Sequence, residues 1–125
     1  MKNNNKDITS EKDVVLMVDS FYEKVNKNPL LSYVFNDFSQ VDWEAHLPKM
    51  YRFWNTLILG KRTYKGNPFA AHISLPIKSQ HFEQWVKIFE QNIDEHFVGP
   101  VAEDTKKRAN SIAYIFQAKL AHLKQ

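Results

Sequence analysis

The chain has no cysteine and little glycine, and the lack of cysteine removes several kinds of chemistry. Its 125 residues include 0 Cys and 3 Gly, so disulfide bonds, iron–sulfur clusters and thiolate zinc sites are excluded. No apolar run approaches the ~20 residues that a helix needs to cross a bilayer. The first residues, MKNNNKD, lack the apolar stretch of a signal peptide. We therefore expect one cytoplasmic domain without a membrane span.

Neither the charge nor any common catalytic motif indicates a function. The chain carries 17 Lys and Arg against 14 Asp and Glu, a net charge of +3, which is too small to predict nucleic-acid binding. There is no P-loop, no Gly-rich dinucleotide turn and no G-x-S-x-G, and no two of the five histidines are four residues apart. The sequence thus offers no basis for a nucleotide-binding protein, a serine hydrolase or a helical two-histidine metal site.

Apolar residues recur every three or four positions in four segments, which is the spacing of amphipathic helices. No segment alternates with a period of two. The fold class is therefore predicted to be all-α. The first helix is expected from Ser10, which begins a capping box with Asp13, to Asn28-Pro29. The second is expected over roughly 43–59, the third from about Ser79 to Gly99-Pro100, and the fourth over about 101–123.

Some shorter features modify this prediction. Pro48 removes a backbone donor, so the second long helix should be distorted near 44–48 or should start near Leu47. A short helical turn is expected within 30–35 and another over Pro68–Ile73, after a loop at 60–68. Residues 1–8 are polar and are predicted to be a flexible segment before a domain at 9–125.

One histidine, His72, differs from the others in its setting. It lies between Pro68 and Pro76 among small and apolar residues. It could be a partly solvated side chain bonded to a backbone carbonyl, or a neutral imidazole offered to a metal that brings its own ligands. Haem is such a group, because the macrocycle holds iron in plane and the protein adds an axial nitrogen. Haem also needs an aromatic-lined slot, which would explain 9 Phe, 5 Tyr and 3 Trp in so small a chain.

Other candidate residues share the apolar faces of the predicted helices. His46, Met50 and Trp54 follow one another at four-residue steps, so they form either an ordinary core stripe or the wall of a pocket. Tyr22 and Trp85 also lie on apolar stripes, although a buried hydroxyl or indole N–H needs a partner. That partner could be a backbone carbonyl or a polar guest in a pocket.

Several short motifs in this chain follow a recognisable order and spacing. They are Phe21-Tyr22-Glu23-Lys24-Val25, Val34-Phe35-Asn36, the run HLPKMYRFW from His46 to Trp54, Leu59-Gly60, Tyr64-x-Gly66-x-Pro68, His72-x-x-Leu75-Pro76 and His81-Phe82-x-x-Trp85-x-x-x-Phe89. Each is weak alone, but together they span roughly residues 10–123. In this arrangement the chain resembles the truncated haemoglobins, and more specifically those of group III, whose pattern also includes Pro48.

The resemblance implies a shortened globin fold in which two helix pairs sandwich haem b, the 2-on-2 arrangement. It implies that His72 is the proximal ligand of iron and that Tyr22 and Trp85 donate to a ligand on the distal side. His46 and Met50 would line that side; His46 could donate, gate or ligate iron. Further candidate haem contacts are Phe35, Trp54 and Phe89, and the cations near a propionate are Lys49, Arg52, Lys61 and Arg62, each equally compatible with a solvated surface charge.

The resemblance also implies a range of functions. The first is binding of dioxygen and other diatomic ligands such as nitric oxide and carbon monoxide, in redox chemistry, detoxification or sensing more than in bulk oxygen transport. The alternative is a haem enzyme with peroxidase-like or nitric oxide dioxygenase activity. The chain has no flavin or nicotinamide motif, so such an enzyme would need a separate reductase. A haem-free helical interaction module is a third possibility.

Overall fold

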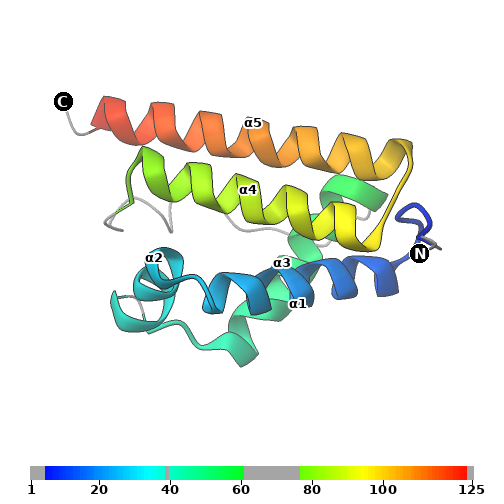
Figure 1. Ribbon diagram of the computed structural model, residues 1–125, viewed down its shortest axis with the longest axis horizontal. Helices are drawn as coiled ribbons and strands as arrows, with labels where there is room; N and C mark the ends of the chain where they lie inside the picture. Colours follow the sequence, from blue (N-terminus) through cyan, green and yellow to red (C-terminus); the bar gives the residue numbers. More distant parts are fainter. Residues whose placement is uncertain (1–4, 39, 61–76, 124–125) are drawn as a thin grey trace.

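The computed structural model describes residues 5–38, 40–60 and 77–123, and these are helical almost throughout (Figure 1). The elements in chain order are α1 (Glu11–Asn26), α2 (Pro29–Ser32), a π-helical turn η1 (Tyr33–Phe38), α3 (Trp43–Leu59), α4 (Ser79–His96) and α5 (Pro100–Leu123). In the described ranges the only β-type pairing is an isolated bridge between Lys6 and Phe97. The all-α prediction is confirmed, whereas the helix expected over Pro68–Ile73 lies outside the described residues.

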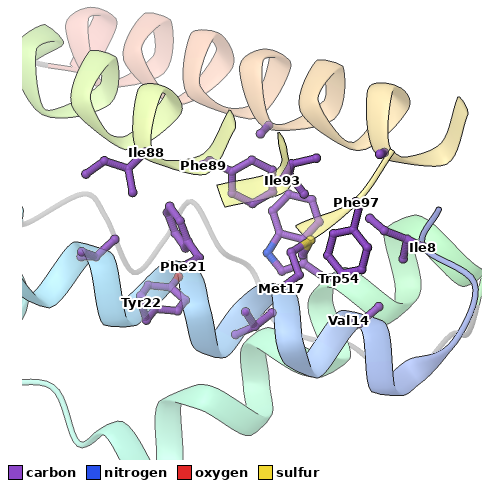
Figure 2. Close-up of a cluster of buried hydrophobic side chains, with 14 of the residues drawn as sticks. Ile8, Val14, Met17, Phe21, Tyr22, Trp54, Ile88, Phe89, Ile93 and Phe97 are labelled. Atoms are coloured by element: carbon purple, nitrogen blue, oxygen red, sulfur yellow. The ribbon is translucent and has the colours of Figure 1, made fainter. Parts of the chain in front are cut away.

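The long helices pack as two pairs. In Figure 1, α4 and α5 run side by side in opposite directions, and α1 lies against the other side of α4. Helix α3 crosses α1 and packs against it. The main core forms where α1, α3 and α4 meet, and its largest buried side chains include Met17, Phe21, Trp54, Phe89 and Ile93 (Figure 2). No helix among the described residues has both the length and the apolarity to span a membrane.

Short-range capping explains where the first helices begin. The Ser10 hydroxyl accepts a hydrogen bond from the Asp13 N–H, and the Asp13 carboxylate accepts from the Ser10 N–H, which is the predicted capping box. Burial alone would raise the pKa of Asp13. Hydrogen bonds from the Lys6 ammonium and from Thr9 outweigh burial and lower that pKa to about 2. Asn28 caps α2 and Asp42 caps α3 in the same local way.

Helix α3 runs through Pro48 without a break. It begins at Trp43, so the expectation of a start near Leu47 is wrong. Pro48 has no N–H, and the Glu44 carbonyl one turn earlier therefore lacks its usual intrahelical donor. The helix survives because Asp42 caps its first turn and because several residues of its apolar face pack against the main core.

A buried amide links α1 and α4. Asn92 has 0% exposure, its side-chain nitrogen donates to the Met17 carbonyl at 3.0 Å and its oxygen accepts from the Lys24 ammonium at 2.8 Å. Lys24 in turn pairs with Glu95 at 2.7 Å. Because both ends of the amide are satisfied, this polar group can be buried at little cost, and it fixes the register of the two helices.

The segment before α1 is part of the packed structure. Ile8 is 1% exposed and belongs to the main core, and the Lys6 carbonyl accepts from the Val98 N–H at 3.0 Å. Residues 5–8 are therefore packed against the rest of the fold, while the flexibility expected for residues 1–8 stays a prediction. The physical reason for this packing is a contact with the α4–α5 turn, about ninety positions away, which no local composition can signal.

Asp7 caps α5 from this distant position. Its carboxylate accepts hydrogen bonds from the N–H groups of Val101 at 2.9 Å and Ala102 at 2.8 Å, in the first turn of the helix. Burial raises the pKa of Asp7, but backbone hydrogen bonds from Val101, Ile8 and Ala102 outweigh burial, and the pKa lies below its usual value. Gly99 makes this approach possible, because a Cβ there would lie 2.5 Å from the Asp7 Cγ and its φ is +138°.

Replacing the Asp7 carboxylate should destabilise the fold in a pH-dependent way. We expect Asp7→Ala to lower the free energy of unfolding by about 1–2 kcal/mol at neutral pH, because a helix cap is lost. The folded-state pKa of Asp7 is depressed, so its contribution is complete above the unfolded pKa and disappears as pH falls through the folded value. Urea titrations from pH 7 downward should show that the difference in unfolding free energy between wild type and Asp7→Ala becomes smaller in acid. Glu23→Ala, on the exposed side of α1, is the control and should leave stability nearly unchanged.

Candidate functional site

Four aromatic rings from α1, η1 and α3 contact one another near the start of α3. Tyr22 of α1, Phe35 of η1, and Trp43 and His46 of α3 contact one another, and we call these residues the aromatic cluster. The Tyr22 ring centroid lies 5.8 Å from that of Phe35, 5.3 Å from that of Trp43 and 5.5 Å from that of His46. Trp43 also lies 5.5 Å from both Phe35 and His46. The sequence brings these rings together because α3 crosses α1 at Tyr22 and η1 turns the chain back toward both.

Tyr22 is the central member of the aromatic cluster. Its side chain is 7% exposed, and its hydroxyl forms no hydrogen bond with any residue in the described ranges. Burial raises the pKa of the hydroxyl well above its usual value. Tyr22 therefore remains a neutral hydrogen-bond donor across the physiological range.

A second set of rings fills the core next to the aromatic cluster. Phe21, Trp54, Trp85 and Phe89 make up this ring stack. Trp85 stacks on Phe89 at 5.4 Å, and Phe89 stacks on Trp54 at 5.1 Å. Phe21 packs edge-on against Trp85 and Phe89 and also contacts Tyr22 at 4.9 Å. Phe21 therefore joins the ring stack to the aromatic cluster.

The predicted site residues differ in their burial. Trp54 is 3% exposed and Phe89 1%, and Figure 2 shows both between α1 and α4 with Met17 and Ile93. The structure thus gives these two a packing role, and their contact with a cofactor stays a prediction. Trp85 is half-buried, and its indole N–H forms no hydrogen bond to another described residue.

The remaining predicted residues lie along α3 or outside the described ranges. His46 and Met50 are half-buried, one turn apart, and the Nε2 atom of His46 is buried. Lys49 is exposed. His72 lies in 61–76, as do Lys61 and Arg62, and the structure does not describe these residues. The structure therefore brings together Tyr22, Phe35 and His46, while the metal-ligand prediction for His72 stays a prediction.

Comparison with known proteins identifies the family. The family model for bacterial-like globins matches residues 6–120. The chain belongs to the bacterial-like globin family. It is 31% identical over 115 residues to the group 3 truncated hemoglobin of Campylobacter jejuni, covering 89% of this chain and 91% of that protein. The crystal structure of the group III truncated hemoglobin from Campylobacter jejuni matches with a TM-score of 0.83 and 31% identity, over 96% of this chain and 95% of that one.

The resemblance to group III truncated haemoglobins, with its 2-on-2 fold, is thus confirmed. The two helix pairs are α1 with α3 and α4 with α5. Membership of the globin family implies haem binding and the binding of small gaseous ligands. The contact of any described residue with the cofactor stays a prediction.

The described residues of this globin fit a flat apolar group. In α3 only Trp54 and Asn55 are buried, although the helix is amphipathic. Its other large apolar side chains are half-buried and pack against the core from one side: Leu47, Met50, Tyr51, Phe53, Leu57 and Ile58. A helix that leaves so much apolar surface partly uncovered is suited to contact an apolar cofactor of large area.

Two residues of the site were not predicted from the sequence. Trp43 was not singled out from the sequence, and Asn36 was included only in the motif Val34-Phe35-Asn36. The Asn36 side-chain oxygen accepts from the Trp43 indole N–H at 2.8 Å, and its nitrogen donates to Asn26 at 2.8 Å and to Ser32 at 3.1 Å. Asn36 thereby connects α1, α2 and η1 to the start of α3. The three-residue spacing between Trp43 and His46 was the available signal that Trp43 shares a face with the site.

Removal of the Asn36 amide should loosen the aromatic cluster. We expect Asn36→Ala to lower the free energy of unfolding by about 1–3 kcal/mol, because the partly buried indole N–H of Trp43 loses its partner. Chemical denaturation measures the change. Asp37→Ala, at the next and exposed position, is the matched control and should shift stability by less than about 0.5 kcal/mol. Equal stability of the two variants would contradict this role for Asn36.

Proposed function

We propose that this globin is a haem b protein that binds diatomic ligands, namely dioxygen, nitric oxide and carbon monoxide, on a pocket face containing Tyr22 and Trp85. The observation that carries the proposal is the pair of donors. The Tyr22 hydroxyl and the Trp85 indole N–H come from two helices, are linked through Phe21, and have no hydrogen-bond partner in the described part of the chain. Two such donors next to an apolar wall suit a small polar guest.

In this proposal several residues of the chain bind the cofactor, each at a different part of it. His72 would hold the iron through its imidazole nitrogen, Phe35 would pack against the macrocycle, and His46 and Met50 would border the ligand. Trp54 and Phe89 support this side from the core, and Lys49 lies near a propionate. When bound, the haem supplies an iron with an open coordination position for a diatomic gas.

Tyr22 and Trp85 act on the ligand as hydrogen-bond donors. A ligand that draws negative charge accepts charge-assisted hydrogen bonds, each of about 1.5–3 kcal/mol. Since about 1.4 kcal/mol is a factor of ten, one such bond slows release by roughly 10–100-fold. The raised pKa of Tyr22 keeps its proton available for this purpose. Slow release suits redox chemistry, detoxification or sensing better than bulk oxygen transport.

The proposal also covers location and partners. We place the protein in the cytoplasm, with dioxygen or nitric oxide as its ligand. Catalytic turnover, peroxidase-like or by nitric oxide dioxygenation, would consume electrons, which a separate reductase would supply. Steady-state assays with peroxide or with nitric oxide distinguish this enzymatic role from reversible binding.

Loss of the proposed axial histidine should be visible in the absorption spectrum. Purified protein is expected to show a strong Soret band and, when reduced under carbon monoxide, the spectrum of a histidine-ligated haem b. His72→Gly should lose this ligation, and added imidazole should restore it. His96→Gly, on α4, is the control and should retain the wild-type spectrum. A normal fifth ligand in His72→Gly without imidazole would refute the assignment.

Removal of either distal donor should accelerate ligand release. We expect Tyr22→Phe and Trp85→Phe each to raise the dioxygen off-rate by about tenfold or more, because one charge-assisted hydrogen bond is lost. The double variant should deviate from additivity, since both donors act on one ligand. Stopped-flow release kinetics measure the rates, with Tyr33→Phe, an exposed tyrosine, as the control. Unchanged rates in both single variants and the double variant would exclude the donor role.

A further inference from the structure

A groove lies between α4 and α5. Its floor is apolar, with Phe82 and Val86 from α4 and Ala113 from α5. On α4, helical spacing turns Glu83, Lys87 and Glu90 away from Trp85 and Phe89, whereas Phe82 and Val86 pack in one core cluster with Trp85. The two helices run side by side along this surface (Figure 1).

The α4 side of the groove has an alternating charge pattern. Glu83, Lys87 and Glu90 follow at four- and three-residue steps, so they lie in one row along the helix. Glu83 and Lys87 are exposed and form no ion pair with any residue in the described ranges. The row therefore presents separate negative and positive charges to whatever covers the groove.

The α5 side is uncharged and includes a large exposed ring. Tyr114 has 73% exposure, and the residues one turn before and after it in the groove are Asn110 and Gln117. Ile115, next to Tyr114, is 47% exposed. Exposed aromatic side chains beside an apolar floor are typical of protein–protein interfaces.

We propose that this groove is a contact surface for a second copy of the same chain. When two copies of α4 run antiparallel about a two-fold axis between positions 83 and 87, Lys87 faces the partner subunit's Glu83. By symmetry, Glu83 faces the partner subunit's Lys87, so one pattern forms two attractive pairs. Tyr114 is then covered over the apolar floor. Glu83 and Lys87 are complementary to the same two residues of a second copy, which favours a second copy over an unrelated protein, while Glu90 accepts from Asn110 within the chain.

The oligomeric state of the full chain tests this proposal. Sedimentation velocity from micromolar to near-millimolar protein should show a concentration-dependent dimer. Lys87→Glu should weaken it by about tenfold or more, because two attractive pairs become repulsive. Tyr114→Ser should weaken it without changing charge. Lys12→Glu, on the exposed side of α1, applies the same charge reversal outside the groove and should leave dimerisation unchanged.

A charge swap gives the sharpest result. Glu83→Lys alone should weaken the dimer, whereas the double variant Glu83→Lys/Lys87→Glu restores both pairs and should dimerise like the wild type. Circular dichroism verifies that every variant is folded. A wild-type chain that is monomeric at all concentrations overturns the proposal and leaves the groove to a different partner. A dimer insensitive to Lys87→Glu, or a swap that fails to restore it, overturns the proposed pairing.

Discussion

The contact between Phe21 and Tyr22 is the constraint on which the site depends. These neighbours on α1 lie 4.9 Å apart with their rings at 65°, and they face different surroundings. Phe21 packs into the ring stack with Trp85 and Phe89, whereas Tyr22 packs into the aromatic cluster. Because Phe21 is held in a dense core, the position of the Tyr22 hydroxyl is fixed by packing rather than by a hydrogen bond of its own. If Tyr22 donates to a ligand as proposed, its side chain would not have to be ordered on binding, which avoids that cost.

Local signals in the sequence were enough to predict most of the helices. The Ser10–Asp13 capping box, the start near Ser79 and the stop before Pro29 depend on residues within one turn of each other, and all three are present in the structure. The role of Asp7 could not be predicted in this way. Its partners Val101 and Ala102 are more than ninety positions away, and a polar N-terminal sequence resembles a flexible one until that contact is known.

The candidate site was predicted more through family resemblance than through chemistry. Tyr22, Phe35 and His46 contact one another in the structure, but their roles toward a cofactor stay predictions, because the residues alone left Tyr22 and His46 compatible with an ordinary core. Trp54 and Phe89 were predicted to contact haem, but their burial is already explained by stacking on each other, so the structure gives no separate sign of a cofactor contact. Trp43 was not predicted as a site residue. An apolar residue at the start of an amphipathic helix has no local property that shows whether it lines a pocket or packs in the core.

Polar contacts hold α3 in place while much of its apolar face is only half-buried. These polar contacts come from η1 and α1. The Trp43 indole is held by Asn36 at the start of the helix, and the Tyr51 hydroxyl donates to Asp19 of α1 further along. Burial and the nearby Asp19 carboxylate raise the pKa of Tyr51 to about 12, so this donor stays protonated. Directional bonds of this kind position a helix without covering its apolar side, whereas closer packing would remove the surface that haem requires.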